Sequence, residues 1–466
     1  MYNAVRNLYS NCESCIRLNN LHTEWFAVRS GVRQGDSISP TLFALYLNEF
    51  AKEIKQLNLG VKLGNVDVSI LLYADDMVLL ANNEHDLQIM LNKMHEWCHK
   101  WRLKVNISKS NIVHFRPPRA KLTQFVFQYG DKNLEIVNEY KYLGVILDQH
   151  LSFKTCSKTL ADSGGRALSA VMSKFKQFKD IGFNTFTRMF ESCVAPVLDY
   201  GSGVWGFVKA NHSDIVQNKA YRYFLGVHNF TPIAAMQSEM GWLPSKYRKY
   251  MNMLRLWNRL IAMPNDRLTK CVFNQDCLKS QNNNWSSAIK NVFALIGQNS
   301  IFQNREQCDL SICQTKLKEK AEDEWKLTVE LKPKLRTFKT FKTDCNTSEY
   351  VKWSMNRYDR SLLAKFRCGI LQLRIETGRF NNTKLEERTC EICESTQIED
   401  EFHFLCVCNA YEQLRTDMFT RTSQKYPHFQ TLSLKDKFIF LLIKCNRELI
   451  KFLKLAWDLR KNILYN

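Results

Sequence analysis

The sequence predicts an α+β protein, in which a small antiparallel sheet with packed helices precedes a mainly helical remainder. Two apolar runs of strand length, 70–73 and 77–80, flank a short polar corner, as in a hairpin. Apolar residues recur at three- and four-residue steps between 84 and 101, the period of an amphipathic helix. From about residue 152 onward the helical pattern dominates. Strand patterns in the first third and helical patterns after it define the fold class.

The corner between the two runs reads Tyr73-Ala74-Asp75-Asp76 and places two carboxylates side by side. We expect the flanking strands to be buried and the carboxylates to stand at the tip. Adjacent carboxylates repel each other unless a cation neutralises them. Magnesium suits such oxygen ligands, and two ions about 3.5–4 Å apart can clamp the attacking and leaving oxygens of a phosphoryl transfer. The alternative is an ordinary solvated turn, where Asp is common.

The stretch Gly31–Pro40 lies just ahead of a predicted helix. Ser39 followed by Pro40 is a helix-start signal, with the serine as N-cap. The apolar face of this helix is expected to consist of Leu42, Tyr46, Phe50 and Ile54. Gln34 and Gly35 precede the helix start, where glycine lets the backbone approach a ligand and a helix N-terminus favours phosphate. The alternative is a capped core helix that follows a flexible loop.

The run 31–40, the following Leu-Phe pair and the corner 73–76 together resemble the reverse transcriptase family, and more narrowly the non-LTR (LINE-type, jockey-like) retrotransposon polymerases. This resemblance implies a partial right-hand polymerase palm, a mainly helical thumb and a C-terminal region with a zinc knuckle. It also implies an RNA-directed DNA polymerase that uses Mg²⁺, held by Asp75 and Asp76. The implied partners are an RNA template, a DNA primer or target and deoxynucleoside triphosphates.

The same resemblance assigns roles to six further positions. These are Gln34, Gly35 and Lys109 for nucleotide and template positioning, and Tyr142, Leu143 and Gly144 for gripping the primer strand. In the second group we expect the glycine to mark a close backbone approach to nucleic acid. The alternatives are an edge strand at 103–110 and one more core strand at 140–147.

The first 30 residues depart from the family pattern. A third metal-binding aspartate is expected on the strand before the Gln34 loop, yet the sequence has no aspartate before Asp36, and its acids there are Glu13 and Glu24. We therefore expect the fingers and the first catalytic strand to be missing and catalysis to be incomplete. One alternative function is a non-catalytic nucleic-acid-binding remnant of a retroelement. A weaker alternative is a protein similar to group II intron maturases.

Four metal-ligating side chains fall in a short window near the C-terminus. They are Cys390, Cys393, His403 and Cys408, in the spacing Cys-x2-Cys-x9-His-x4-Cys. Thiolates and an imidazole so spaced fit a closed, structural Zn²⁺ site, which would add folding energy to a small segment. Cys406 is an alternative fourth ligand, although the resemblance to the LINE-type knuckle points to Cys408. Accidental clustering in a chain with 16 cysteines is the remaining alternative.

Charge and composition restrict the partners. Lysine and arginine outnumber the acids 66 to 46, which gives a net charge of +20 and suits a protein that lies along a phosphate backbone. Basic side chains also surround the predicted zinc site, where we expect nucleic-acid contact; they are Arg367, Arg374, Arg379 and Arg388. Apolar runs stay shorter than a membrane span, so no membrane partner is expected. Widely spaced cysteines favour a reducing setting, the nucleus or the cytoplasm.

Four segments are predicted along the chain. Residues 1–150 form the partial palm, 151–275 a helical thumb-like region, 276–345 an irregular basic linker and 346–466 a helical segment that carries the zinc site. A loop at Gln281–Asn284 falls in the linker.

Overall fold

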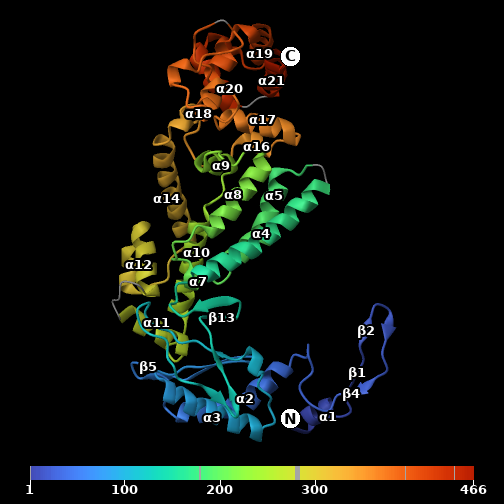
Figure 1. Ribbon diagram of the computed structural model, residues 1–466, viewed down its shortest axis with the longest axis vertical. Helices are drawn as coiled ribbons and strands as arrows, with labels where there is room; N and C mark the ends of the chain where they lie inside the picture. The colour runs from blue at the N-terminus through green and yellow to red at the C-terminus, as the bar shows by residue number, and fades with distance from the viewer. Residues whose placement is uncertain (1, 178–179, 279–283, 394, 445–446, 466) are drawn as a thin grey trace. The chain divides into compact units, whose positions relative to one another are not determined.

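The computed structural model describes residues 2–177, 180–278, 284–393, 395–444 and 447–465 (Figure 1). Helices and short strands together confirm the α+β class. The chain divides into two compact units, unit 1 (Met1–Asn138) and unit 2 (Glu139–Asn466). The boundaries expected at 150, 275 and 345 stay predictions. None of the described helices combines the length and the apolar character that crossing a lipid bilayer requires.

Unit 1 combines three helices with short strand pairs. Its helices are α1 (Tyr2–Tyr9), α2 (Ser39–Gln56) and α3 (Glu84–Lys100), followed by the 3₁₀ turn η1 (Ile107–Lys109). Its strands are β1 (Glu13–Ser14), β2 (Arg17–Leu18), β3 (Leu21–His22), β4 (Phe26–Ala27), β5 (Val61–Leu63), β6 (Val66–Val68), β7 (Ile70–Tyr73), β8 (Asp76–Leu79), β9 (Asn111–Ile112), β10 (Gln128–Tyr129), β11 (Lys132–Asn133) and β12 (Glu135–Ile136). Among the described residues these strands pair two by two, antiparallel except for β9 with β12, instead of forming one sheet.

The predicted helix between 84 and 101 is confirmed as α3. Asn83 caps it, because its side chain accepts a hydrogen bond from the Asp86 amide at 2.9 Å. The buried face of α3 packs against α2 and β7 in one apolar cluster. Its members are Leu47, Phe50, Ile54, Ile70, Met90, Met94, Trp97 and Cys98.

The expected start and face of α2 need correction. Ser39 is the first helical residue and not the N-cap, since its hydroxyl donates to the Arg33 carbonyl oxygen at 2.7 Å. The buried face runs through Leu47, Phe50 and Ile54. Tyr46 lies outside it, 37% exposed, and donates instead to the Trp101 carbonyl oxygen. The predicted face is therefore right at Phe50 and Ile54 and wrong at Tyr46, whose hydroxyl needs a polar partner.

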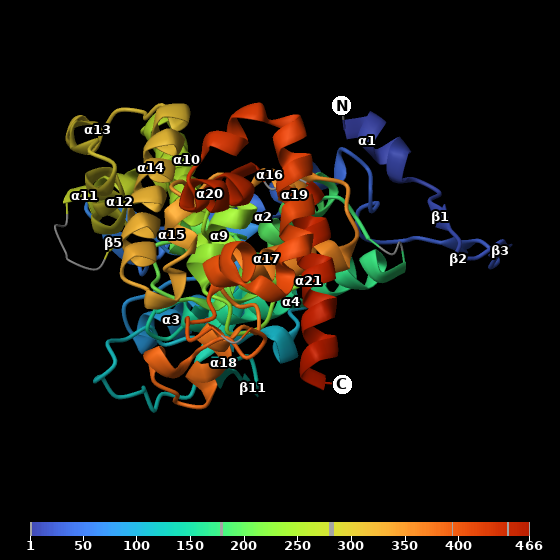
Figure 2. The same ribbon diagram turned by 90° about the horizontal axis from the view of Figure 1, so that it is seen from above.

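Unit 2 begins with one hairpin and continues as helices (Figures 1 and 2). Its regular elements are β13 (Glu139–Tyr142), β14 (Val145–Asp148), α4 (Lys154–Gln177), α5 (Phe183–Met189), α6 (Ala195–Leu198), α7 (Ser202–Trp205), α8 (His212–Leu225), α9 (Ile233–Met240), α10 (Ser245–Ala262), α11 (Leu268–Leu278), α12 (Trp285–Leu295), α13 (Asn299–Asn304), α14 (Leu310–Glu330), α15 (Phe338–Phe341), α16 (Glu349–Lys352), α17 (Arg357–Arg367), α18 (Arg374–Phe380), α19 (Glu412–Lys425), α20 (Leu434–Lys444) and α21 (Arg447–Tyr465). Two π-helical turns, η2 (Phe190–Val194) and η5 (His403–Val407), interrupt this series.

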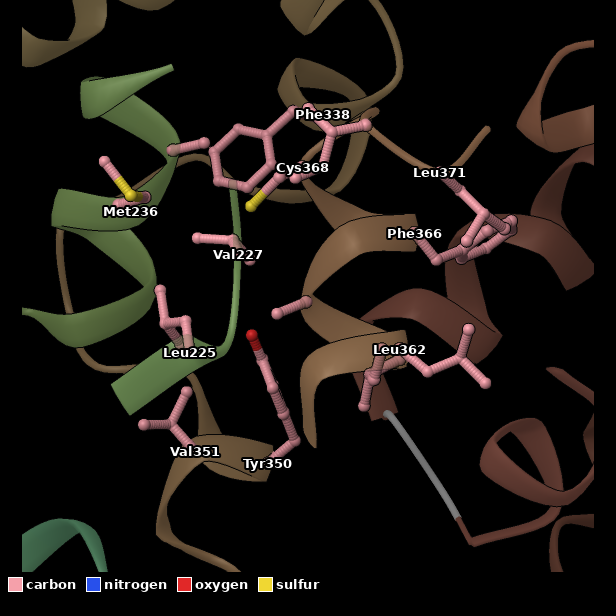
Figure 3. Close-up of a cluster of buried hydrophobic side chains, with 14 of the residues drawn as sticks. Leu225, Val227, Met236, Phe338, Tyr350, Val351, Leu362, Phe366, Cys368 and Leu371 are labelled. Atoms are coloured by element: carbon pink, nitrogen blue, oxygen red, sulfur yellow. The ribbon is translucent and has the colours of Figure 1, made fainter. Parts of the chain in front are cut away.

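The main core of unit 2 joins sequence-distant helices. In Figure 1, α4 and α8 lie side by side, and Figure 2 shows α19 beside α21. One cluster of buried side chains extends from Ala161 on α4 to Ala456 on α21. Figure 3 shows part of this cluster, with Leu225 and Val227 at the end of α8 and Leu362 and Cys368 from the α17 segment. The helices after residue 346 therefore bury their apolar faces against those before 240.

The structure corrects the expectation of an irregular linker at 276–345. Helices α12 and α14 cover much of it, and the stripe Cys313, Leu317, Ala321, Trp325 and Val329 on α14 is buried. The many charged residues between these positions form the exposed face, which explains why composition alone suggested a linker. Residues 281–283 of the expected loop lie outside the described residues, and Asn284 caps α12 by accepting from the Ser287 amide.

A buried ion pair lies within the main core. The Arg367 guanidinium on α17 donates to Glu239 of α9 at 3.0 Å, and their side chains are 3% and 0% exposed. The same guanidinium donates to the Leu442 carbonyl oxygen and stands 4.5 Å from the Phe341 ring centroid. This side chain thus connects α9, α15, α17 and α20.

We expect Arg367→Met to lower the free energy of unfolding by about 3–5 kcal/mol, because it leaves Glu239 buried without a counter-charge. Urea unfolding followed by circular dichroism measures this. Arg379→Met is the control, because the Arg379 side chain is 41% exposed and its ion pair with Glu376 is long, at 3.9 Å. The double variant Arg367→Met/Glu239→Met should recover part of the loss. Equal stability of Arg367→Met and the control would contradict this account.

Candidate functional site

The Asp75–Asp76 corner is the tip of the β7–β8 hairpin. Tyr73 pairs with Asp76 across the ladder, and Ala74 takes the left-handed conformation with φ 51°. Both aspartates are exposed, and neither carboxylate forms a hydrogen bond or ion pair with a residue in the described part of the chain. Exposed carboxylates without counter-charges fit a hard cation. The two strands were expected to be buried, but they are only partly buried. On β7, for example, Ile70 is buried whereas Tyr73 is 64% exposed.

The predicted nucleotide-positioning residues lie on the surface of the same unit. Gln34 and Gly35 are exposed, and the glycine has a φ of +89°, which favours this residue type. Flanking contacts hold the loop, since the Arg33 side chain donates to the Leu8 carbonyl oxygen at 2.7 Å. Lys109 ends the 3₁₀ turn η1 and is exposed, so the alternative of an edge strand here is wrong. No described cluster of metal ligands joins these residues to the aspartates.

The predicted primer-gripping residues form the tip of the β13–β14 hairpin. Leu143 and Gly144 are its two turn residues, with φ of 46° and 84°, the positive values of a type I′ turn. The Tyr200 hydroxyl donates to the Leu143 carbonyl oxygen at 2.9 Å. A Cβ at Gly144 would lie 2.8 Å from the Tyr200 ring. The close approach that this glycine permits is therefore to Tyr200, a contact that sequence spacing could not reveal.

The four predicted zinc ligands come together. The ligand atoms of Cys390, Cys393, His403 and Cys408 all lie within 4.8 Å of one another. The sulfurs of Cys390 and Cys408 are 3.9 Å apart, close to the ~3.8 Å expected for two thiolates about 2.3 Å from one tetrahedral ion. Among the described residues this is the one such group, and Cys406, though buried, is outside it. The cluster can hold a metal ion.

Local structure orients these ligands. His403 begins the π-helical turn η5, and Cys408 follows it as the C-cap. The Nε2 atom of His403 lies 3.4 Å from the Cys393 sulfur, while Nδ1 lies 3.2 Å from Gln397 Oε1, which can accept a hydrogen bond from Nδ1–H. This arrangement leaves Nε2 for the metal. The hydrogen bond from Cys408 lowers the pKa of Cys390 below the ordinary value for a thiol, which favours the ligating thiolate.

A buried carboxylate supports the cluster from behind. Glu399 is 0% exposed and forms a double hydrogen bond with the Arg460 guanidinium of α21, 2.9 Å long for one of its two contacts. It also accepts from the Arg374 amide at 2.8 Å and lies 3.6 Å from the Cys390 sulfur. Sequence analysis did not single out Glu399, because its partner stands 61 residues away.

The four arginines expected to contact nucleic acid differ in their surroundings, and the structure contradicts the expectation for Arg367. Arg367 is buried in the ion pair with Glu239, and Arg388 donates to the carbonyl oxygens of Thr383 and Ile375. Arg374 pairs with an acidic neighbour at 3.1 Å. Arg379 is the most exposed of the four, and its contact with nucleic acid stays a prediction.

The comparison with protein families concerns unit 1 and the hairpin that begins unit 2. Residues 3–147 match the family described as reverse transcriptase (RNA-dependent DNA polymerase). The matched range includes the Gln34 loop, the exposed Asp75–Asp76 tip and the hairpin with Leu143 and Gly144. Residues 3–147 are therefore similar to a reverse transcriptase domain.

Relatives place the chain more narrowly. It is 26% identical over 208 residues to the RNA-directed DNA polymerase from mobile element jockey of Drosophila funebris, which covers 43% of this chain and 22% of the relative. Two Drosophila melanogaster proteins, the probable RNA-directed DNA polymerases from transposon BS and transposon X-element, match at 24% over 230 residues and 26% over 259 residues. These alignments cover 47% and 51% of this chain. The chain is related, at modest identity, to reverse transcriptases of non-LTR retrotransposons.

The chain spans only about a quarter of the length of these relatives, since the aligned shares are 22%, 25% and 27%.

We predict that the protein binds one equivalent of zinc and that Cys393→Ser or Cys408→Ser releases it, because three ligands leave the tetrahedron open. Elemental analysis of protein purified without chelator measures the metal. Cys406→Ser is the matched control: it removes a buried thiol nearby and should retain zinc. Loss of zinc from the control alone would identify Cys406 as the ligand, and parent protein without zinc would remove the site.

Proposed function

We propose that this chain is an RNA-directed DNA polymerase of the non-LTR retrotransposon type, acting on an RNA template, a DNA primer and deoxynucleoside triphosphates. The observation that carries the proposal is the exposed Asp75–Asp76 tip inside the reverse transcriptase match. A hard divalent cation needs oxygen ligands that are accessible and not already paired, and these two carboxylates fit.

In this proposal Asp75 and Asp76 hold Mg²⁺, and Gln34, Gly35 and Lys109 position nucleotide and template. Bound magnesium supplies charge stabilisation for the transferring phosphoryl group. The exposed loop at Gln34 presents its backbone and amide to the substrate, while the Arg33 contact keeps the loop in place. In unit 2, the hairpin of Tyr142, Leu143 and Gly144 contacts the primer and the Cys/His cluster is a structural zinc site.

Unit 2 also offers a surface for a duplex. Arg166, Lys174 and Lys176 are exposed on α4, while the apolar residues between them face the core. We propose that this helix belongs to the thumb and lies along the phosphates of a hybrid. All cysteines among the described residues are free thiols, which supports a nuclear or cytoplasmic setting.

A second candidate function is a non-catalytic nucleic-acid-binding protein. The observation that favours it is that Asp75 and Asp76 belong to no group of three metal ligands among the described residues. Polymerase activity and binding can be separated experimentally.

We expect a protein of the 466 residues to extend a primer on poly(rA) with magnesium poorly or not at all, because two carboxylates lack the third. Adding a family-like N-terminal segment with its aspartate should restore synthesis. In that longer protein Asp75→Asn or Asp76→Asn should reduce the rate by orders of magnitude, since losing a metal ligand typically costs several kcal/mol of transition-state stabilisation.

Asp131→Asn, an exposed aspartate of the same unit, is the control for these variants and should leave the rate unchanged. Robust synthesis by the 466-residue protein would overturn the need for a third carboxylate. Undiminished synthesis by Asp75→Asn in the longer protein would refute the proposed metal site.

We also expect affinity for an RNA–DNA hybrid to fall steeply with salt, by about a thousandfold or more between 50 and 200 mM if six or more phosphates are contacted. Lys174→Gln should reduce the salt slope by about one. Lys318→Gln, an exposed lysine on α14, is the control. Fluorescence anisotropy at several salt concentrations measures both, and an affinity independent of salt would exclude phosphate contacts by the α4 side chains.

A further inference from the structure

An open cavity of about 490 Å³ lies where the end of α8 meets the start of α17. The residues that line it are Arg222, Gly226, Val227, Arg357, Tyr358 and Ser361. Of these described residues none is acidic and two are arginines. The cavity is within unit 2 and separate from the Cys/His cluster and from the α4 lysines used above.

The cavity is held in shape by close packing. Gly226 ends α8 in the left-handed conformation, and a Cβ there would lie 2.7 Å from Ser361. The Ser361 hydroxyl donates to the Gly226 carbonyl oxygen at 2.6 Å. Beneath them, the buried Arg360 donates to the Phe224 carbonyl oxygen at 2.8 Å and pairs with Asp180. The site is therefore preformed by rigid elements of the fold.

Both arginines of the cavity are fixed by the protein. Arg357 stands 4.6 Å from the Tyr223 ring centroid and donates to the Tyr223 carbonyl oxygen. Arg222 donates to the Asn229 carbonyl oxygen at 3.2 Å, and its Nε atom is buried without a hydrogen-bond partner. Neither guanidinium forms an ion pair with a carboxylate among the described residues. Two fixed positive charges without counter-ions favour an anionic ligand.

Exposed aromatic rings extend from the cavity. His228 follows the lining residue Val227, and its ring centroid is 6.3 Å from that of Phe230. Phe230 in turn lies 6.0 Å from Phe380 at the end of α18. These two phenylalanines are 66% and 62% exposed, and Tyr358 is 47% exposed. Hydrogen bonds from Thr231 to the His228 carbonyl oxygen fix the turn that carries Phe230.

Large exposed rings beside unpaired arginines match the chemistry of unpaired nucleotides. Bases stack on aromatic faces, and the phosphates between them need positive charge. Lys365 adds a positive charge close to His228, and the pKa of that imidazole is lowered first by burial and then by this charge. In a duplex the bases stack on each other, so they are not available to stack on the exposed rings.

We propose that this surface, made of Arg222, Arg357, Tyr358, Phe230 and Phe380, binds a single-stranded segment of RNA, with bases on the phenylalanines and phosphates at the arginines. The choice of RNA over DNA rests on the proposed function, whereas the single-stranded character rests on the surface itself.

The test uses the 466-residue protein and fluorescence anisotropy with a labelled twelve-nucleotide oligo(rU), its oligo(dT) counterpart and a twelve-base-pair RNA duplex. We expect Phe230→Ala and Phe380→Ala each to weaken oligo(rU) binding about tenfold. Phe230→Trp should retain binding because it keeps a stacking face. Arg357→Gln should weaken binding and reduce the salt slope by about one. The controls are Leu331→Ala, 81% exposed in the same unit, and Arg255→Gln, an exposed arginine on α10.

Unchanged oligo(rU) affinity in both phenylalanine variants would overturn the proposal, as would equal effects of these variants on the duplex. A concentration-dependent mass that Phe230→Ala abolishes would instead assign the surface to contact between copies of the chain. Tighter binding of oligo(dT) than of oligo(rU) would keep the single-stranded site and remove RNA as its ligand. Primer extension by the longer protein is scored separately, so that failure of the polymerase function leaves the binding result interpretable.

Discussion

The Cys/His cluster depends on one buried carboxylate, Glu399. Its side chain meets Arg460 of the last helix and the Arg374 amide, and its main chain connects Ile375 and Arg388. A fully buried charge is tolerated only when it is paired and hydrogen-bonded, and here both conditions are met. The C-terminal helix is therefore part of the framework that positions Cys390.

The same requirement recurs across unit 2. Glu239 with Arg367, Glu401 with Arg336, and Asp180 with Arg360 each join segments far apart in the sequence. These pairs use basic residues that would otherwise count toward a nucleic-acid surface. The net charge of +20 is consequently a poor guide to where a polyanion binds, and the exposed arginines and lysines without acidic neighbours are the informative ones.

Sequence patterns within a short segment correctly predicted the features that depend on residues close together in the chain. The three- and four-residue steps of α3 gave the correct helix, and the spacing of Cys390, Cys393, His403 and Cys408 identified a group that the fold does bring together. The failures were non-local. Tyr46 lies outside the buried face of α2 and donates a hydrogen bond to Trp101, 55 positions away. Nothing in the neighbourhood of Arg388 or Leu143 indicates that their partners are backbone carbonyls and Tyr200.

The stripe on α14 has a geometric consequence. Its buried residues are spaced by four, whereas a helical turn takes about 3.6 residues, so the stripe winds around the helix by about 40° at each step. Cys313, Leu317 and Ala321 belong to the core with α10 and α12, while Trp325 and Val329 belong to the main core. Helix α14 therefore packs against two different hydrophobic cores, one at each of its ends. Because neither core can lose α14 without exposing part of the other, the two should melt as one cooperative body.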